Sequence, residues 1–273
     1  MIFTSAHKNR KGVRRSPDGG SRPAAKGTRI WAVAFWLLLW QLGAMALNQR
    51  LLLVLLPSPV EVLSCLARLA VTAGFWRSIG WSAARILSGF MIALVGGTML
   101  AGLSAGFPIV RVLLAPLVTA VKAVPVVSFI ILALVWLPSR WLSLFISALM
   151  VFPTVYLNLL EGVDQTDHGL LEMAWVFRVP LGRRLRDIYL PQALPWLRSA
   201  CSLGLGLCWK SGVAAEVIGL LSGSVGERLY TAKIYFEMPE LFAWTVTIVA
   251  LSAAFEKLVL RLLDRFEAKG AKT

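Results

Sequence analysis

Three ionisable side chains lie within otherwise apolar stretches of the chain: Lys122, Lys210 and Glu216. Because an ionised group is costly in hydrocarbon, such residues indicate a function, most simply that they line a path for a polar solute. The two lysines favour an anion as that solute, and Glu216 is expected near the outer gate of the path. Each lysine also has a simpler interpretation, in which its aliphatic stem carries the amine to a membrane interface or, near Pro125, the amine binds a freed backbone carbonyl.

A second charged segment begins at Glu172 and ends at Pro191, between two strongly apolar stretches. It belongs to a loop of about thirty residues, 163–191. Proteins that cross a membrane several times usually keep their cytoplasmic loops short. A loop of this length that carries its own short helices is most simply interpreted as a docking element for a soluble partner.

Local signals predict two helices within this loop. Asp167 is a good N-cap, and Val179 precedes a proline, so the first helix is expected to end near Arg178. A second helix is expected over residues 181–189. The apolar residues of the first helix fall on one face: Leu170, Leu171, Ala174 and Phe177. Three arginines follow, either as a charged rim for a partner or as ordinary cytoplasmic positive charge: Arg183, Arg184 and Arg186.

The residues that enzymes use are scarce in this sequence. His7 and His168 are the only histidines, and neither lies in an apolar stretch. The run from Gly204 to Ser211 resembles a phosphate-binding loop by eye, but Trp209 stands where that motif needs glycine. Three cysteines form neither a disulfide framework nor a metal-ligand spacing: Cys65, Cys201 and Cys208. We therefore expect no enzyme, no metal or cofactor, and no nucleotide site in this chain.

The composition indicates that most of the chain lies within a lipid membrane. Of 273 residues, 58% are hydrophobic, and the mean hydropathy is +0.72. A soluble protein of this size does not need so much apolar surface. The net charge of +14 would suit a nucleic-acid partner. However, the basic residues cluster before, between and after apolar stretches rather than on a folded basic domain, so a nucleic-acid partner is not expected.

Six apolar stretches are expected to cross a hydrocarbon core of ~30 Å as helices: Ile30–Asn48, Ile86–Val110, Leu113–Leu137, Trp141–Leu160, Pro195–Gly219 and Leu241–Leu263. Lys122 and Pro125 interrupt the third. An interfacial helix is expected over Val60–Val71, and a short outer helix before Pro239. Small residues recur every four positions in the second stretch and predict a close helix-packing face: Gly89, Ala93, Gly97, Ala101 and Ala105.

The distribution of positive charge predicts the orientation. Placing both termini and the loop in the cytoplasm puts 19 of the 28 Lys and Arg residues inside and seven outside, as the positive-inside rule requires. The chain is thus divided into a basic cytoplasmic tail (1–29), a transmembrane domain (30–265) and a cytoplasmic C-terminal tail (266–273).

The loop resembles the EAA loop of permeases of binding-protein-dependent ABC importers, in which Glu-Ala-Ala and Gly precede Ile-x-Leu-Pro. The matching residues are Glu172, Ala174, Ile188, Leu190 and Pro191. Met173 replaces an Ala of the motif, and Arg178 replaces the Gly, which normally allows a turn with positive φ that arginine adopts poorly. We therefore expect Val179-Pro180 to rebuild the bend by another route. Three segments resemble the nitrate, sulfonate and taurine branch: Leu56–Pro59, Lys122–Pro125 and Ala215–Gly219.

The resemblance implies an all-α integral membrane protein with six transmembrane helices and the architecture of a type I ABC importer permease. It implies a transport subunit of the bacterial cytoplasmic (inner) membrane. Its partners would be a cytoplasmic ABC ATPase that binds the ATP, an extracytoplasmic substrate-binding protein and a second permease copy, most simply as a homodimer. The ATPase-coupling residues would be Glu172, Ala174, Arg178, Ile188, Leu190 and Pro191.

The resemblance favours a nitrate-, sulfonate- or taurine-like anion as the solute. Within the family, an importer for a vitamin precursor is the alternative. Outside the family, the alternatives are an ion-coupled secondary transporter and a membrane enzyme. An ion-coupled transporter would need a coupling-ion site in the spans, for which two lysines and one glutamate are a thin supply.

Overall fold

The computed structural model describes residues 26–48 and 56–270, and this part of the chain consists of helices without strands. In chain order the elements are α1 (Lys26–Asn48), α2 (Pro59–Ala70), α3 (Ala73–Gly106), α4 (Pro108–Ala123), α5 (Val126–Trp136), α6 (Ser139–Asp164), α7 (His168–Val176), α8 (Leu181–Arg184), the π-helical segment η1 (Leu185–Tyr189), α9 (Leu190–Ile218), α10 (Val225–Ile234) and α11 (Met238–Gly270). The expected all-α fold is confirmed. The basic tail expected over 1–29 falls almost entirely outside the described residues.

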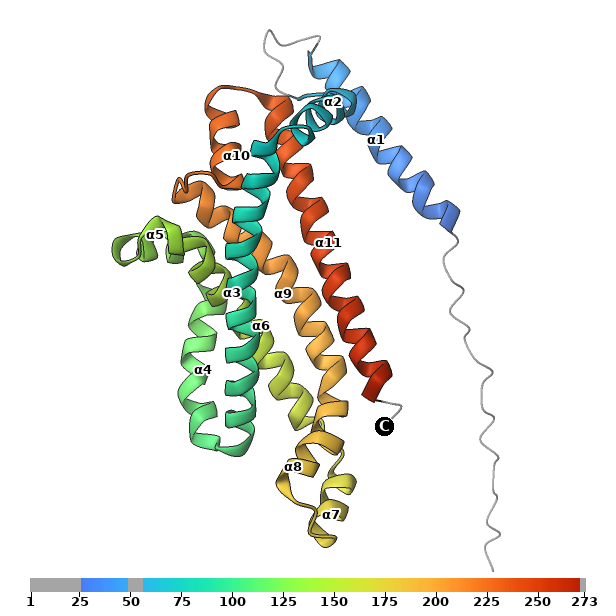
Figure 1. The fold of residues 1–273 in the computed structure, drawn as a ribbon, viewed down its shortest axis with the longest axis vertical. Coiled ribbons are helices and arrows are strands. Elements are labelled where there is room, and N and C mark those ends of the chain that lie inside the picture. The colour runs from blue at the N-terminus through green and yellow to red at the C-terminus, as the bar shows by residue number, and fades with distance from the viewer. Residues whose placement is uncertain (1–25, 49–55, 271–273) are drawn as a thin grey trace, which may run out of the picture.

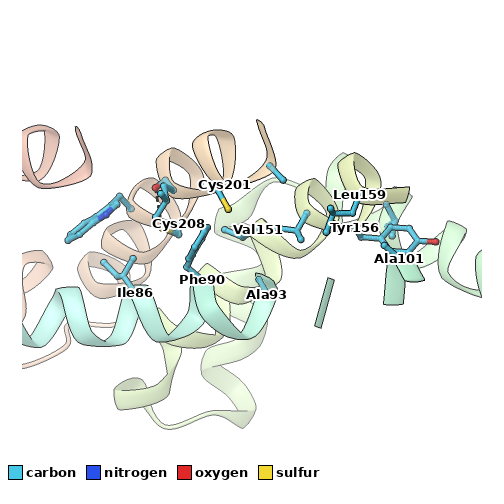
Figure 2. Close-up of a cluster of buried hydrophobic side chains, with 14 of the residues drawn as sticks. Ile86, Phe90, Ala93, Ala101, Val151, Tyr156, Leu159, Cys201 and Cys208 are labelled. Atoms are coloured by element: carbon cyan, nitrogen blue, oxygen red, sulfur yellow. Dashed lines mark hydrogen bonds between the residues drawn. The ribbon is translucent and has the colours of Figure 1, made fainter. Parts of the chain in front are cut away.

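Three long helices, α3, α6 and α9, form the centre of the bundle, and α11 packs along α9 (Figure 1). Their facing sides interlock through fully buried side chains such as Phe90, Val151 and Leu205. Figure 2 shows this cluster, which includes Cys201 and Cys208. The two cysteines are therefore packing residues of one helix face.

Small residues of α3 let it approach α6 closely. A Cβ atom on Gly89 would collide with the backbone oxygen of Leu144, and one on Gly97 would lie 2.8 Å from Val155 Cγ1. The two alanines of the same row that follow these glycines are buried as well, whereas Ala105 is exposed. The packing face predicted from the four-residue spacing is thus confirmed for its first four members and ends just before the end of α3.

Three helices of the described chain are each long and apolar enough to cross a membrane: α3, α6 and the continuous helix Leu181–Ile218 formed by α8, η1 and α9. The pair α4–α5 meets the same criterion as one bent unit. The first and sixth expected spans fall on α1, with the apolar stretch Trp31–Leu47, and on α11. This arrangement is compatible with six spans. Because α11 remains helical to Gly270, the tail expected from residue 266 begins as part of the last helix.

The third expected span, 113–137, is not one helix. It contains α4 and α5, which differ in direction by 108°. Pro125 explains the break, because proline disfavours the helical conformation of the residue before it, and Val124 is accordingly extended with φ −84° and ψ 133°. α3 also ends before the expected Val110, because Pro108 begins α4.

Two short helices, α2 and α10, lie at the end of the bundle opposite α7 and α8 (Figure 1). α2 lies where the sequence predicts a short helix over Val60–Val71. Ser58 and Glu61 form a capping box at its start, and Cys65 packs against α11. α10 lies where the sequence predicts a short helix before Pro239, and Gly223 before it has a φ of 76°. We refer below to the α7–α8 end and to the α10 end of the bundle.

Candidate coupling loop and solute path

The loop between α6 and α9 folds as a hairpin with two short arms. The first arm is α7, which Asp167 caps as expected by accepting a hydrogen bond from the Gly169 N–H at 2.8 Å. The N–H of Asp167 donates to Gln192 Oε1 at 3.0 Å and so fastens the start of α7 to α9. At the turn, Arg184 Nε donates to the carbonyl of Val179 at 2.9 Å. The bond to Gln192 ties the start of α7 to the bundle, and the bond from Arg184 to Val179 stabilises the turn between the arms.

Arg178 itself makes the turn between the arms. Its φ is 51°, in the left-handed region that arginine occupies at a cost of roughly 1–2 kcal/mol. The Val179 N–H donates to the Ala174 carbonyl at 2.9 Å, and the Arg178 N–H donates to the Trp175 carbonyl at 3.0 Å. This pair of bonds is a Schellman motif. The expectation that Val179-Pro180 rebuilds the bend is therefore wrong, because Arg178 adopts the conformation that the motif's glycine normally provides.

Beyond the turn, the chain stays helical to the end of α9. The second loop helix expected over 181–189 is present as α8 and η1, but no break separates it from the fifth span, which we expected to begin at Pro195. Pro191 is the second residue of α9 and lies inside this continuous helix, directly after the π-helical turn of η1. Ile188 is half-buried, whereas Leu190 and Pro191 are exposed.

Large apolar side chains of the loop are exposed and form what we call the apolar loop surface: Met173, Trp175, Val176, Phe177, Leu181 and Leu185. Trp175 and Phe177 are 73% and 75% exposed. The single apolar face expected for α7 is therefore wrong in part. Ala174 is buried, but Phe177 lies beyond the last helical residue and is turned out to solvent. Glu172 and Arg178 are also exposed.

A groove between α4 and α6 contains Lys122. Two cavities of about 430 and about 390 Å³ meet there, and Lys122 and Leu157 line both. The amine of Lys122 makes no ion pair or hydrogen bond with any described residue. Nearer the α7–α8 end, Arg111 Nη2 is paired with Asp164 Oδ2 at 2.7 Å. Of the two cations that line these cavities, Arg111 is neutralised by a carboxylate and Lys122 is not.

The other two charged residues expected on a path lie elsewhere. Lys210 is exposed and Glu216 is fully buried, so they occupy different sides of α9, as their six-residue separation predicts. Neither lines the two cavities around Lys122. The structure therefore keeps the three charged residues of the apolar stretches apart rather than gathering them along one path.

Glu216 caps the start of α10. Its Oε2 accepts hydrogen bonds from Ser82 Oγ at 2.7 Å and from the Gly226 N–H at 3.2 Å. Ser82 Oγ in turn accepts from the Val225 N–H at 2.9 Å. The positive charge of Arg85 attracts the carboxylate, but Arg85 Nη1 and Glu216 Oε1 each lack a hydrogen-bond partner. We call Ser82, Glu216 and Gly226 the α10 clasp, since they join α3, α9 and α10.

Sequence reasoning missed Ser82 and Arg85. Both lie on α3 close to the α10 end, one helical turn apart, inside a long helix of otherwise apolar character. A serine and an arginine at that spacing in such a helix were the available signal, because polar groups in an apolar helix need partners within the protein. By contrast, the six expected coupling residues all lie within the loop and the first turn of α9: Glu172 and Ala174 on α7, Arg178 at the turn, Ile188 in η1, and Leu190 and Pro191 at the start of α9.

Comparison with curated proteins gives matches along most of the chain. An ABC transporter permease protein of Brucella melitensis is 29% identical over 231 residues, which cover 84% of this chain and 89% of that protein. A Bacillus subtilis protein named as the aliphatic sulfonates transport permease SsuC is 27% identical over 94% of this chain and 91% of its own length. The taurine transport system permease protein TauC of Escherichia coli is 27% identical over 88% and 86%.

Comparison with solved structures supports the fold. The crystal structure of an amino acid ABC transporter with histidines has a TM-score of 0.58, with 15% identity over 75% of this chain and 97% of that chain. Residues 93–270 match a family model described as "Binding-protein-dependent transport system inner membrane component". Since these residues make up more than half of the sequence and include the loop, the groove and the α9–α10 junction, the chain belongs to this family of membrane-embedded transport permeases.

Proposed function

We propose that the chain is the membrane-spanning subunit of an ATP-driven importer, and that its loop passes the motion of a separate ATPase to the spanning helices. The observation that carries this proposal is the apolar loop surface. Two hydrogen bonds stabilise the loop, one from the Asp167 N–H to Gln192 and one from Arg184 to the Val179 carbonyl. Large apolar side chains gathered on an exposed loop mark an interaction surface for a protein partner. Because α8 continues without a break into α9, a push on this surface reaches the bundle directly.

The rest of the assembly follows from the two ends of the molecule. The α7–α8 end faces the cytoplasm and the ATPase, in agreement with the positive charge of the loop. The α10 end faces outward and receives a substrate-binding protein. A second copy of the chain completes the path as a homodimer. The names of the similar proteins SsuC and TauC support a small sulfonate-like anion as the solute.

An ion-coupled secondary transporter is the competing function, and it requires a site for the driving ion. Among the described residues, no group of three or more His, Cys, Asp or Glu side chains is gathered in one place. Uptake by cells that carry the complete importer should continue when a protonophore collapses the proton gradient and should stop when vanadate inhibits the ATPase. Uptake that follows the proton gradient would support the competing function.

The loop is tested by replacing its two most exposed aromatic residues. Trp175→Ser with Phe177→Ser should insert in the membrane normally but lower co-purification of the ATPase roughly tenfold or more, since aromatic anchors at interfaces each contribute over ~1 kcal/mol. Glu172→Lys should weaken co-purification as well. Trp136→Ser is the matched control, because Trp136 is 77% exposed on α5, away from the loop. ATPase recovery that is equal for all variants would remove the basis for a docking loop.

A further inference from the structure

We propose that Lys122 is the residue that attracts the solute in a hydrated path between α4 and α6, and that the solute is a small anion that passes beside its amine. This proposal rests on the proposed function, since it presumes a transported solute. It extends that function by naming the residue and the charge that select the solute.

The position of Lys122 along α4 suits such a role. Arg111 and Lys122 are eleven residues apart on one helix, which is about 16 Å at ~1.5 Å per residue. Taking Arg111 as the level of the nearer membrane interface, a hydrocarbon core ~30 Å thick places Lys122 about half-way across it. α4 rises from the α7–α8 end beside α3, and α5 turns aside immediately beyond Lys122 (Figure 1). The groove thus leads from one end of the bundle to its middle and stops at the break.

Among the residues that line the groove, Lys122 is the cation without a carboxylate partner. Three polar side chains that line the groove donate hydrogen bonds to other groups of the protein. Thr119 Oγ1 donates to the Ala115 carbonyl at 2.8 Å, Tyr156 Oη to Ser104 Oγ at 3.0 Å and Asn158 Nδ2 to the Thr154 carbonyl at 2.8 Å. No aspartate or glutamate lines either cavity. A cleft whose net charge is of one sign concentrates ions of the opposite sign.

The size of the groove and the state of the amine agree with this role. Cavities of about 430 and about 390 Å³ fall within the ~300–1,000 Å³ typical of small-molecule sites. The simpler interpretations of Lys122 are not met. Within the described part of the chain, the amine binds no carbonyl released by Pro125 and pairs with no carboxylate. Its depth along α4 also places it far from either membrane interface.

A test that needs no knowledge of the solute uses thiol reagents of opposite charge. Thr119→Cys is introduced one helical turn from Lys122 into the full chain, with the three native cysteines replaced by serine. Its rates of modification by the anionic 2-sulfonatoethyl and the cationic trimethylammonioethyl methanethiosulfonates are measured in nanodiscs. The anionic reagent should react faster, and Lys122→Gln should lower the ratio of the two rates roughly tenfold. Lys122→Arg should keep the ratio high.

Two controls separate local charge from general effects. Lys233→Gln removes an exposed cation on α10 and should leave the ratio unchanged. Asn158→Cys repeats the measurement from α6, so the result does not depend on one engineered thiol or on the folding of one variant. An unmodified thiol at both positions, or a ratio that Lys122→Gln does not change, would overturn the proposal.

The thiol-modification test and the test of the proposed function can fail separately. Lys122→Gln should bind the ATPase as the unmodified chain does, because Lys122 is far from the apolar loop surface. A failure of the loop variants to release the ATPase would therefore contradict the proposed function while leaving the measured anion selectivity of the groove intact.

Discussion

Three residues of the described chain other than glycine have a positive φ: Arg178, Leu220 and Phe236. Each follows the last turn of a helix, and in each case the N–H of the next residue donates back to that turn at between 2.9 and 3.2 Å. Such backbone strain costs of order 1–3 kcal/mol per residue and persists where the surroundings fix the turn. One of these turns shapes the coupling loop, and the other two lie at either end of the α10 segment.

Arg178→Gly should stabilise the loop. The Arg178 side chain is exposed and makes no hydrogen bond within the described structure, so its removal costs little, whereas glycine adopts a φ of 51° without steric strain. We expect a gain of about 1 kcal/mol, seen as slower protease cleavage within 163–191. Arg178→Ala is the control, because alanine also disfavours this φ. Equal stabilisation by glycine and alanine would assign the effect to the side chain instead of the backbone.

The α10 clasp predicts a local effect of changing Glu216. Glu216→Leu leaves the Ser82 hydroxyl and the Gly226 N–H without an acceptor, and an unpaired buried polar group costs about 1–3 kcal/mol. Hydrogen–deuterium exchange of residues 224–234 should therefore speed up roughly tenfold. Glu216→Gln should have a smaller effect, because it keeps one acceptor oxygen. Lys210→Gln, on the exposed side of the same helix, should leave the exchange unchanged, and an equally unchanged Glu216→Leu would contradict the clasp.

At the scale of elements, α3 and α6 lie so close together that the glycines of α3 facing α6 have no room for a larger side chain. Gly97→Ala places a methyl group 2.8 Å from Val155 Cγ1, and Val155 is fully buried, so the helices must separate. Overpacking of this kind typically costs about 1–3 kcal/mol. The neighbouring Gly96 has open space around its Cβ position, so Gly96→Ala is the matched control and should not destabilise. Thermal unfolding in detergent distinguishes the two, and equal melting temperatures would contradict the close contact.

The sequence was sufficient for the elements whose signal is local. Asp167 as a cap, the packing row on α3 and the presence of the helix α2 follow from side-chain type and spacing alone. The bend between α4 and α5 was visible as Pro125, but its angle of 108° depends on packing against distant helices. Likewise, the partners of Glu216 come from α3 and α10, and Ser82 is 134 residues away along the chain, so no local pattern could have paired them.

At the scale of the whole molecule, the two ends of the bundle should lie on opposite sides of the membrane. Arg183 in the loop and Ser222 before α10 are both exposed. In a chain without native cysteines, Arg183→Cys should react with an impermeant maleimide only in inverted vesicles, and Ser222→Cys only in right-side-out vesicles. Labelling of both positions from one side would contradict the proposed orientation.

One unbroken helix, from Leu181 to Ile218, joins the loop to the α10 end of the bundle. Its 38 residues extend about 57 Å at ~1.5 Å per residue, with Leu185 of the apolar loop surface near one tip and Glu216 near the other. A tilt at the first tip is carried toward the second, because the helix continues without a break through the π turn and through Pro195. The π turn is the one place within this rod where the pitch differs. Removing a single residue from it would rotate everything beyond it by about 100°, so these five residues set the angle between the apolar loop surface and the α10 end.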